Sequence, residues 1–200
     1  MLKFRWRKAF YTQLSLNMIV SPLRIPGCLK IFPKVMVDER GDFIKTFVES
    51  EFQRNNLLTV FKEEYFSRSY KGVLRGMHFQ IPPFEYVKIV SCLSGSVRDV
   101  LLDIRIGSPT YGDFEILELN GNEAISLYLP AGIAHGFISL SEVAVVSYKV
   151  NTEYAPEFDC GILWNSFGLD WGLEKPIIST RDEGFISFND FKSPFRYKAG

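Results

Sequence analysis

The segment from Gly72 to Gln80 carries the residues of this chain that are best suited to proton chemistry. It reads Gly-Val-Leu-Arg-Gly-Met-His-Phe-Gln and places Arg75, His78 and Gln80 in a stretch that otherwise has the composition of a strand. His78 is one of only two histidines in the chain. A histidine titrates near neutral pH, and a neighbouring arginine adds a fixed positive charge. The segment therefore suits proton abstraction from an anionic substrate.

Side-chain alternation decides whether these residues can share one pocket. In a regular strand His78 and Gln80 lie on one face, whereas Arg75 lies on the other. They can serve one pocket only if the strand bulges, and Gly76 is the expected place for a bulge. The spacing leaves open the alternative that Arg75 forms a surface ion pair.

Charged residues in later apolar segments are further candidates. Lys88 has apolar neighbours on both sides, which predicts a buried lysine that needs a partner or an anionic ligand. The alternative is an edge-strand lysine that prevents aggregation. Asp99 and Asp103 share one face of the segment Val97–Arg105 and could orient a histidine or a substrate. For Asp103, structural pairing with Arg105 is the favoured interpretation.

Three more residues could complete a site. His135 opens a strand after a turn, where ligand sites are common, although a hydrogen-bonded core histidine is equally compatible. Tyr148 could donate a proton if nearby charge lowers its pKa from the usual value of about 10, but most strand tyrosines are core residues. Asp182 could support a histidine, which spacing alone does not show. Two histidines without a cysteine cluster make a poor metal site, so no metal is expected.

The rest of the chain alternates between strand-like segments and turns. Glu49–Leu58 has helical composition, with Ser50 as a candidate N-cap, and is the only clear helix. Asn120-Gly121 predicts a hairpin. Strands are expected at Ile19–Val20, Leu29–Phe32, Phe43–Val48, Phe61–Ser69, Val73–Gln80, Val87–Leu93, Val97–Arg105, Phe114–Leu119, Ala124–Leu129, Gly136–Leu140 and Val143–Val150. This spacing predicts an all-β sandwich or barrel, with the tail after Trp164 folded over it.

Composition narrows the class of protein. The chain has 200 residues, of which 15% are aromatic, and 23 basic side chains balance 23 acidic ones. It is therefore globular, and nucleic acid is a poor partner. No apolar run is long enough to span a membrane. Three widely spaced cysteines, without a disulfide framework, favour the cytoplasm. Residues 1–17 are basic and are expected to form a poorly ordered extension, or else a targeting or membrane-surface segment, before one domain over 18–200.

Several blocks, taken together and in order, resemble the dTDP-4-dehydrorhamnose 3,5-epimerase family, the cupin-like jelly-roll enzymes of activated deoxysugar synthesis. The blocks are Pro33–Val35 with Asp38–Gly41, Gly72–Gln80, Val97–Arg105 with Gly107–Gly112, Leu129–Phe137, Tyr148-Lys149 and Gly161–Asn165. The resemblance implies an all-β jelly roll with a few short helices. It also implies a homodimer in which the Asp38–Gly41 segment reaches toward the neighbouring subunit's site.

The resemblance further implies roles for individual residues. His78 matches the general base and Asp182 the carboxylate paired with it, while Tyr148 matches the proton donor on the other face of the sugar. Lys88 matches the lysine near the C4 carbonyl. The family needs neither metal nor cofactor. Substrate-binding positions, of which Arg75 and Arg40 chiefly hold the diphosphate, are Arg40, Phe43, Glu63, Tyr65, Arg75, Gln80, Asp99, His135 and Tyr154.

The implied reaction is inversion of C3, C5 or both in a nucleotide-linked 4-keto-6-deoxyhexose. Protons at these carbons are acidic because they lie alpha to a ketone, and a cation can hold the enolate. One block departs from the family, because Glu63-Glu-Tyr-Phe-Ser67 replaces a Gln-x-Asn-x-Ser pattern that contacts thymine. An ionised Glu63 accepts hydrogen bonds only, so a base with an exocyclic amine, such as cytosine, is an alternative. The motifs also leave open single-centre epimerisation and a non-catalytic jelly roll that binds nucleotide sugars.

Overall fold

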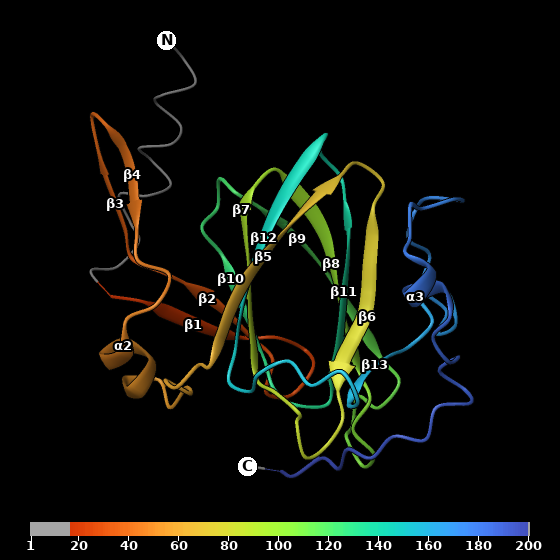
Figure 1. The fold of residues 1–200 in the computed structure, drawn as a ribbon. Helices are drawn as coiled ribbons and strands as arrows, with labels where there is room; N and C mark the ends of the chain where they lie inside the picture. The colour runs from red at the N-terminus through yellow and green to blue at the C-terminus, as the bar shows by residue number, and fades with distance from the viewer. Residues whose placement is uncertain (1–16, 200) are drawn as a thin grey trace.

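Two antiparallel sheets, packed face to face, form the body of the protein in the computed structural model, which describes residues 17–199 (Figure 1). The prediction for residues 1–17 lies, apart from Asn17, outside the described residues. One sheet contains β1 (Ile19–Pro22), β2 (Leu29–Phe32), β10 (Ser126–Leu129), β7 (Lys88–Ser94), β12 (Val143–Val150) and β5 (Glu63–Tyr70), in that order. The other contains β13 (Asp159–Gly161), β6 (Leu74–Gln80), β11 (Ile133–Ser139), β8 (Ser96–Asp103) and β9 (Phe114–Asn120).

From β5 to β12 the chain changes sheet at every connection except the one between β8 and β9. This alternation produces the cupin-like jelly roll that the sequence predicted. It also overturns the predicted hairpin at Asn120-Gly121, because β9 and β10 lie in different sheets. Gly121 instead donates its amide to the carbonyl of Gly95, at 3.0 Å. The turn therefore links the two layers.

The helices differ in detail from the prediction. α2 covers Glu49–Arg54 and ends before Leu58, because Asn56 adopts a φ of +55°. Its N-cap is Val48, so the prediction of Ser50 was wrong. A second short helix, α3 (Thr180–Glu183), was not expected, and the side chain of its N-cap Ser179 accepts the Asp182 amide.

Three hydrophobic clusters hold the layers together. The first fills the space between the sheets, where Phe137, Leu101 and Val146 are at most 1% exposed. The second lies on the outer side of the five-stranded sheet, which the C-terminal segment covers with side chains that include Trp171 and Phe195. The third lies beneath α2. The C-terminal segment thus packs on the sandwich, which brings α3 beside β6 (Figure 1).

A two-stranded hairpin stands away from the body. It consists of β3 (Val35–Asp38) and β4 (Gly41–Ile44), joined at the turn that the sequence predicted (Figure 1). Phe43 is 60% exposed on it. The hairpin therefore presents apolar surface that the other described residues, 17–199, leave exposed.

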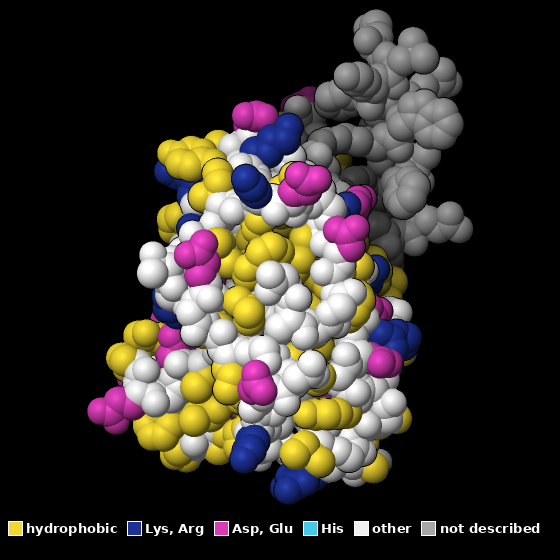
Figure 2. All heavy atoms as spheres, turned by 90° about the vertical axis from the view of Figure 1, so that its right-hand side faces the viewer, with side chains coloured by type: hydrophobic (Ala, Val, Ile, Leu, Met, Phe, Trp, Pro, Cys, Tyr) yellow, Lys and Arg dark blue, Asp and Glu magenta, His cyan; other side chains and the backbone are white. Residues whose placement is uncertain are grey.

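The opposite side of the molecule, where α3 lies, mixes acidic, basic and hydrophobic side chains (Figure 2). Neither sign of charge dominates this face. None of the described helices has the length and apolar character of a membrane span.

Candidate active site

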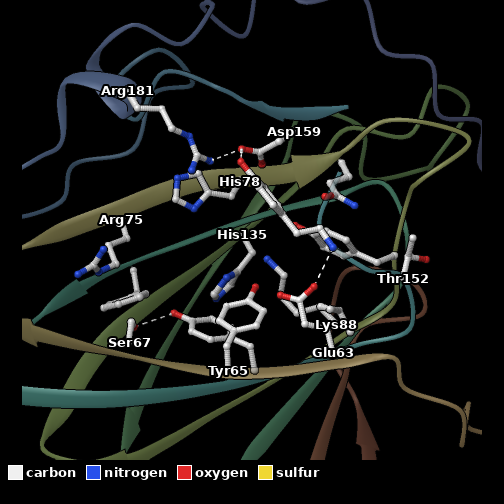
Figure 3. Close-up of a pocket in the computed structure, with 16 residues that line it drawn as sticks. Glu63, Tyr65, Ser67, Arg75, His78, Lys88, His135, Thr152, Asp159 and Arg181 are labelled. Atoms are coloured by element: carbon white, nitrogen blue, oxygen red, sulfur yellow. Dashed lines mark hydrogen bonds and ion pairs between the residues drawn. The ribbon is translucent and has the colours of Figure 1, made fainter. Parts of the chain in front are cut away.

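A cavity of about 330 Å³ opens between the sheets and is lined by polar and aromatic side chains from both (Figure 3). The six-stranded sheet supplies residues of β5, β7 and β12, and the five-stranded sheet supplies residues of β6, β11 and β13. The lining residues are Glu63, Tyr65, Ser67, Arg75, His78, Gln80, Tyr86, Lys88, His135, Phe137, Tyr148, Val150, Thr152, Tyr154, Asp159 and Arg181.

A bulge in β6 brings Arg75 and His78 to this cavity. His78 pairs with His135 and Arg75 pairs with Phe137, so β6 has one residue more than β11 over this interval. Gly76 has a φ of +137°, and a Cβ there would lie 2.5 Å from the Cα of Gly136. Only glycine fits this close approach. The predicted bulge at Gly76 is thus confirmed.

Arg75 does not form a surface ion pair among the described residues. Its Nε donates to Ser69 Oγ at 3.0 Å, and its guanidinium lines the cavity. Figure 3 shows Arg75 and His78 across the cavity from Tyr65 and Ser67. A fixed cation therefore lies on the same side of the cavity as His78, where it can hold an anionic ligand.

His78 and Asp182 form a hydrogen-bonded pair although 104 positions separate them. His78 Nε2 lies 2.9 Å from Asp182 Oδ1, and Asp182 Oδ2 accepts the amide of Gly76 at 3.0 Å. Burial alone would raise the pKa of Asp182, but its hydrogen bonds outweigh that effect and lower it. The ionised carboxylate can only accept a hydrogen bond, so Nε2 of the neutral His78 ring carries the proton. Nδ1 is then the basic atom of the ring.

The charge state of His78 follows from its surroundings. Burial lowers the pKa of His78 below its usual value of 6.5, against the opposing effect of Asp182. The ring is therefore neutral at pH 7 and can act as a general base.

Lys88 lies inside the molecule, at the start of β7. This strand runs between β10 and β12, so the edge-strand interpretation was wrong. The side chain is 4% exposed, and burial lowers its pKa to about 8. It is still largely charged at pH 7 and can stabilise a developing negative charge in the cavity.

Tyr148 reaches the cavity from the opposite sheet to His78. Its hydroxyl lies 3.4 Å from Ser67 Oγ, and the ring of Tyr65 stacks on it with the centroids 4.8 Å apart. Burial raises the pKa of Tyr148 and holds its proton on the hydroxyl across the neutral range. Tyr148 therefore fits a proton donor, which gives up its proton only to a strong base such as a carbanion.

His135 is both a cavity residue and a hydrogen-bonded core residue. Its Nε2 lies 2.8 Å from Asp99 Oδ2, and burial lowers its pKa. Asp99 is fully buried and does not line the cavity, so its predicted contact with substrate is corrected to a supporting role behind His135. The structural interpretation of Asp103 is confirmed, because both of its carboxylate oxygens accept hydrogen bonds from Arg105.

Three predicted binding residues lie where the cavity opens. Glu63 Oε2 accepts the amide of Tyr154 at 2.7 Å, while Tyr65 and Tyr154 are 41% and 57% exposed. Gln80 also lines the cavity, but its amide is bonded to backbone groups of Phe84, Glu153 and Ala155. Gln80 therefore fixes the surrounding loops, and its contact with substrate stays a prediction.

The sequence prediction missed five polar residues of the cavity, namely Ser67, Tyr86, Thr152, Asp159 and Arg181. Arg181 pairs with Asp159 at 2.9 Å. Its position next to Asp182 was a usable signal, whereas β13 is too short to show any alternation around Asp159.

Arg40 and Phe43 lie on the β3–β4 hairpin and do not line this chain's cavity. In the described residues no three histidine, cysteine or acidic side chains gather closely enough to hold a metal ion.

Comparison with known proteins agrees with this geometry. A family model described as dTDP-4-dehydrorhamnose 3,5-epimerase matches residues 22–190. A dTDP-4-dehydrorhamnose 3,5-epimerase of Shigella flexneri is 39% identical over 176 residues, which are 86% of this chain and 97% of that protein. The chain belongs to the dTDP-4-dehydrorhamnose 3,5-epimerase family.

Solved structures of family members share the whole fold. The dTDP-6-deoxy-D-glucose-3,5-epimerase of Legionella pneumophila, in complex with dTDP-4-keto-L-rhamnose, has a TM-score of 0.86 and 36% identity, and the match covers 92% of this chain and all of that one. A 3'-monoepimerase of Streptomyces bikiniensis, in complex with dTDP-quinovose, has a TM-score of 0.78 and 30% identity, over 83% of this chain and 86% of that one. A 3,5-epimerase and a 3'-monoepimerase therefore share this architecture.

Proposed function

We propose that this protein inverts C3 and C5 of dTDP-4-dehydro-6-deoxy-D-glucose, giving dTDP-4-dehydro-L-rhamnose. The observation that carries the proposal is the placement of His78 and Tyr148 on facing sheets of one cavity that also contains Lys88. A base and an acid on opposite sides of a sugar ring are what inversion of a carbon requires. Membership of the family supplies the substrate class.

The residues suffice for a balanced reaction. Nδ1 of His78 removes the proton from the carbon alpha to the ketone, and the C–H bonding electrons move to the C4 oxygen as an enolate. The ammonium of Lys88 holds that oxygen. As the carbonyl re-forms, Tyr148 donates its proton to the opposite face of the same carbon. The resulting imidazolium and phenolate then exchange protons with water, which restores both groups for the second centre.

Arg75 supplies the second requirement, which is anchoring of the diphosphate. Its guanidinium lines the cavity beside the base, and arginine binds phosphate through two parallel hydrogen bonds. Binding energy from this remote group can position the ring between His78 and Tyr148.

Solvent deuterium exchange tests the proposal. The protein is incubated with dTDP-4-dehydro-6-deoxy-D-glucose in D2O, and NMR follows deuterium at C3 and C5. We expect exchange at both carbons in the natural protein and none in the His78→Asn variant, which should still bind dTDP. Binding without exchange in the natural protein would leave only a non-catalytic binding role, and exchange at one carbon would identify a single-centre epimerase.

A second candidate concerns the nucleotide. Glu63 presents a carboxylate to the cavity, and only Oε2 is bonded to the backbone, at the amide of Tyr154. The other oxygen can accept a hydrogen bond from an exocyclic amine, which cytosine has and thymine lacks. Calorimetry with dTDP and CDP distinguishes the two, since clearly tighter binding of dTDP eliminates the CDP-linked substrate.

We further propose a homodimer in which the β3–β4 hairpin serves the partner's cavity. The support is the exposed Phe43 on a hairpin that stands away from the body (Figure 1). Mixing Arg40→Ala with His78→Asn tests this idea, because a mixed dimer has one site with both residues intact. Recovery of activity on mixing is expected, and a monomeric mass in solution contradicts the proposal.

We assign the reaction to the cytoplasm. Cys28, Cys92 and Cys160 are all free thiols, as is usual in a reducing compartment. Mass spectrometry after rapid alkylation of intact cells checks this, because oxidised thiols would point to another compartment.

A further inference from the structure

The ammonium of Lys88 has aromatic rings as neighbours where an ion pair would be expected. A buried lysine normally pairs with a carboxylate, yet no acidic oxygen of the described residues lies within ion-pair distance of Lys88 Nζ. Nζ lies 4.9 Å from the centroid of the Tyr86 ring and 5.9 Å from that of Tyr148. Both distances are within the range of cation–π attraction. The nearer ring belongs to a residue to which neither the reaction nor the binding scheme above assigns a role.

Tyr86 is held firmly in this position. The carbonyl of Glu85 accepts a hydrogen bond from Thr152 Oγ1 at 3.1 Å, and the amide of Val87 donates to Asn151 Oδ1 at 2.7 Å. These bonds flank Tyr86 on both sides and tie its backbone to the segment that follows β12. The backbone that carries the ring is therefore held by contacts other than Lys88.

Charged groups from several elements face Lys88, and some of them raise its pKa while others lower it. Asp99 of β8 and Asp159 of β13 favour the ammonium, whereas Arg181 of α3 disfavours it. His78 of β6 and His135 of β11 also face it, and both are neutral at pH 7. With burial as the largest influence, the pKa of Lys88 falls to about 8. At this value a small change in the surroundings alters the charged fraction at physiological pH.

We propose that Tyr86 is a positioning residue for the reaction, whose ring face holds Lys88 in the cavity and favours its ammonium form. This inference rests on the proposed function, in which Lys88 stabilises the enolate. The ring quadrupole stabilises a cation, and it does so more strongly in a water-poor cavity than at the surface. Burial raises the pKa of Tyr86 well above its usual value, so the phenol stays neutral and adds no phenolate charge beside Lys88.

Two substitutions distinguish the effect of the Tyr86 ring on Lys88 from the effect of the Tyr86 hydroxyl. Tyr86→Phe keeps the ring face, and Tyr86→Leu removes it with little loss of apolar volume; Tyr86→Met replaces the leucine variant if that one fails to fold. The rate of deuterium exchange is measured against pH in each. Loss of the ring destabilises the ammonium, so the alkaline limb of the profile should move down by about one pH unit in Tyr86→Leu. In Tyr86→Phe the alkaline limb of the profile should stay at the same pH as in the natural protein.

A direct titration makes the outcome independent of catalysis. Lysine labelled with 15N at Nζ reports its own pKa by NMR, and the Lys88→Met variant identifies the Lys88 signal. We expect a lower Lys88 pKa in Tyr86→Leu and an unchanged one in Tyr86→Phe. An unchanged pKa in both variants overturns the inference, as does an equal shift in both. If the natural protein catalyses no exchange, the proposed function fails, and this titration alone still decides whether Tyr86 controls the charge of Lys88.

Discussion

Replacing Asp182 by asparagine should change the tautomer of the base while leaving its position intact. The carboxylate serves two donors, since Oδ1 faces His78 Nε2 at 2.9 Å and Oδ2 accepts the amide of Gly76 at 3.0 Å. Asparagine has one acceptor and one donor group. If its carbonyl faced His78, its NH2 group would oppose the Gly76 amide, and an unpaired buried amide costs about 1–3 kcal/mol.

The favoured orientation therefore places the carbonyl toward Gly76 and the NH2 group toward His78. Nε2 must then accept a hydrogen bond, so the proton of the neutral ring moves to Nδ1 and the basic lone pair is lost. The same change beside a catalytic histidine in a serine protease lowers kcat by about 10⁴-fold. This corresponds to about 5 kcal/mol of transition-state stabilisation, and we expect a loss of this size in Asp182→Asn.

The assay is the initial rate of deuterium incorporation with saturating substrate, together with calorimetry of dTDP binding. Binding should stay within about threefold of the natural protein, because Asp182 does not line the cavity. Asp190→Asn makes the same change at an exposed position and should leave both quantities unaltered. A rate for Asp182→Asn within tenfold of the natural protein would refute the tautomer argument.

The bulge, the titrating groups and the proton donor each allow one further test. Gly76→Ala should lower the free energy of unfolding by about 3 kcal/mol or more, measured by urea denaturation, because its Cβ would meet backbone at 2.5 Å. Gly168→Ala, also at a positive φ (+82°) but with nothing within 4 Å of the added Cβ, should cost only about 1–2 kcal/mol; equal losses would contradict the close-packing argument. The pH profile of kcat/KM should fall below the His78 pKa, which is under 6.5, and above the Lys88 pKa of about 8; a rate still rising at pH 9 would exclude the ammonium. Tyr148→Phe should abolish inversion while retaining dTDP binding, and an unchanged rate of epimerisation would remove Tyr148 as the acid.

The sequence indicated the strands more reliably than their pairing. Alternating apolar residues identify a strand such as β12 because one face of it is buried. Turn chemistry at Asn120-Gly121 is local and carries no information about which sheet the next strand joins. For the same reason the pattern predicted a hairpin where the chain crosses between layers.

In the site, too, features that depend on neighbouring residues were predictable from the sequence, whereas contacts between distant residues were not. Gly76 was identifiable because Arg75 and His78 could meet only through a bulge. Asp182 was not identifiable from spacing, since 104 positions separate it from His78 and only the folded chain brings them together. The family resemblance supplied this pair, but it gave no role to Tyr86, whose contact with Lys88 depends on the loop before β7.

Because His78 and Tyr148, the proposed base and acid, lie on different sheets, the distance between them depends on the packing behind them. Tyr148 and Phe137 belong to the cluster that sets the separation of the layers. Substitutions such as Val146→Ala or Leu101→Ala, at residues of the same cluster that do not line the cavity, can therefore alter the distance between the two groups proposed to transfer protons. The width of the active site in this sandwich is thus determined by side chains of the hydrophobic interior that do not themselves line the cavity.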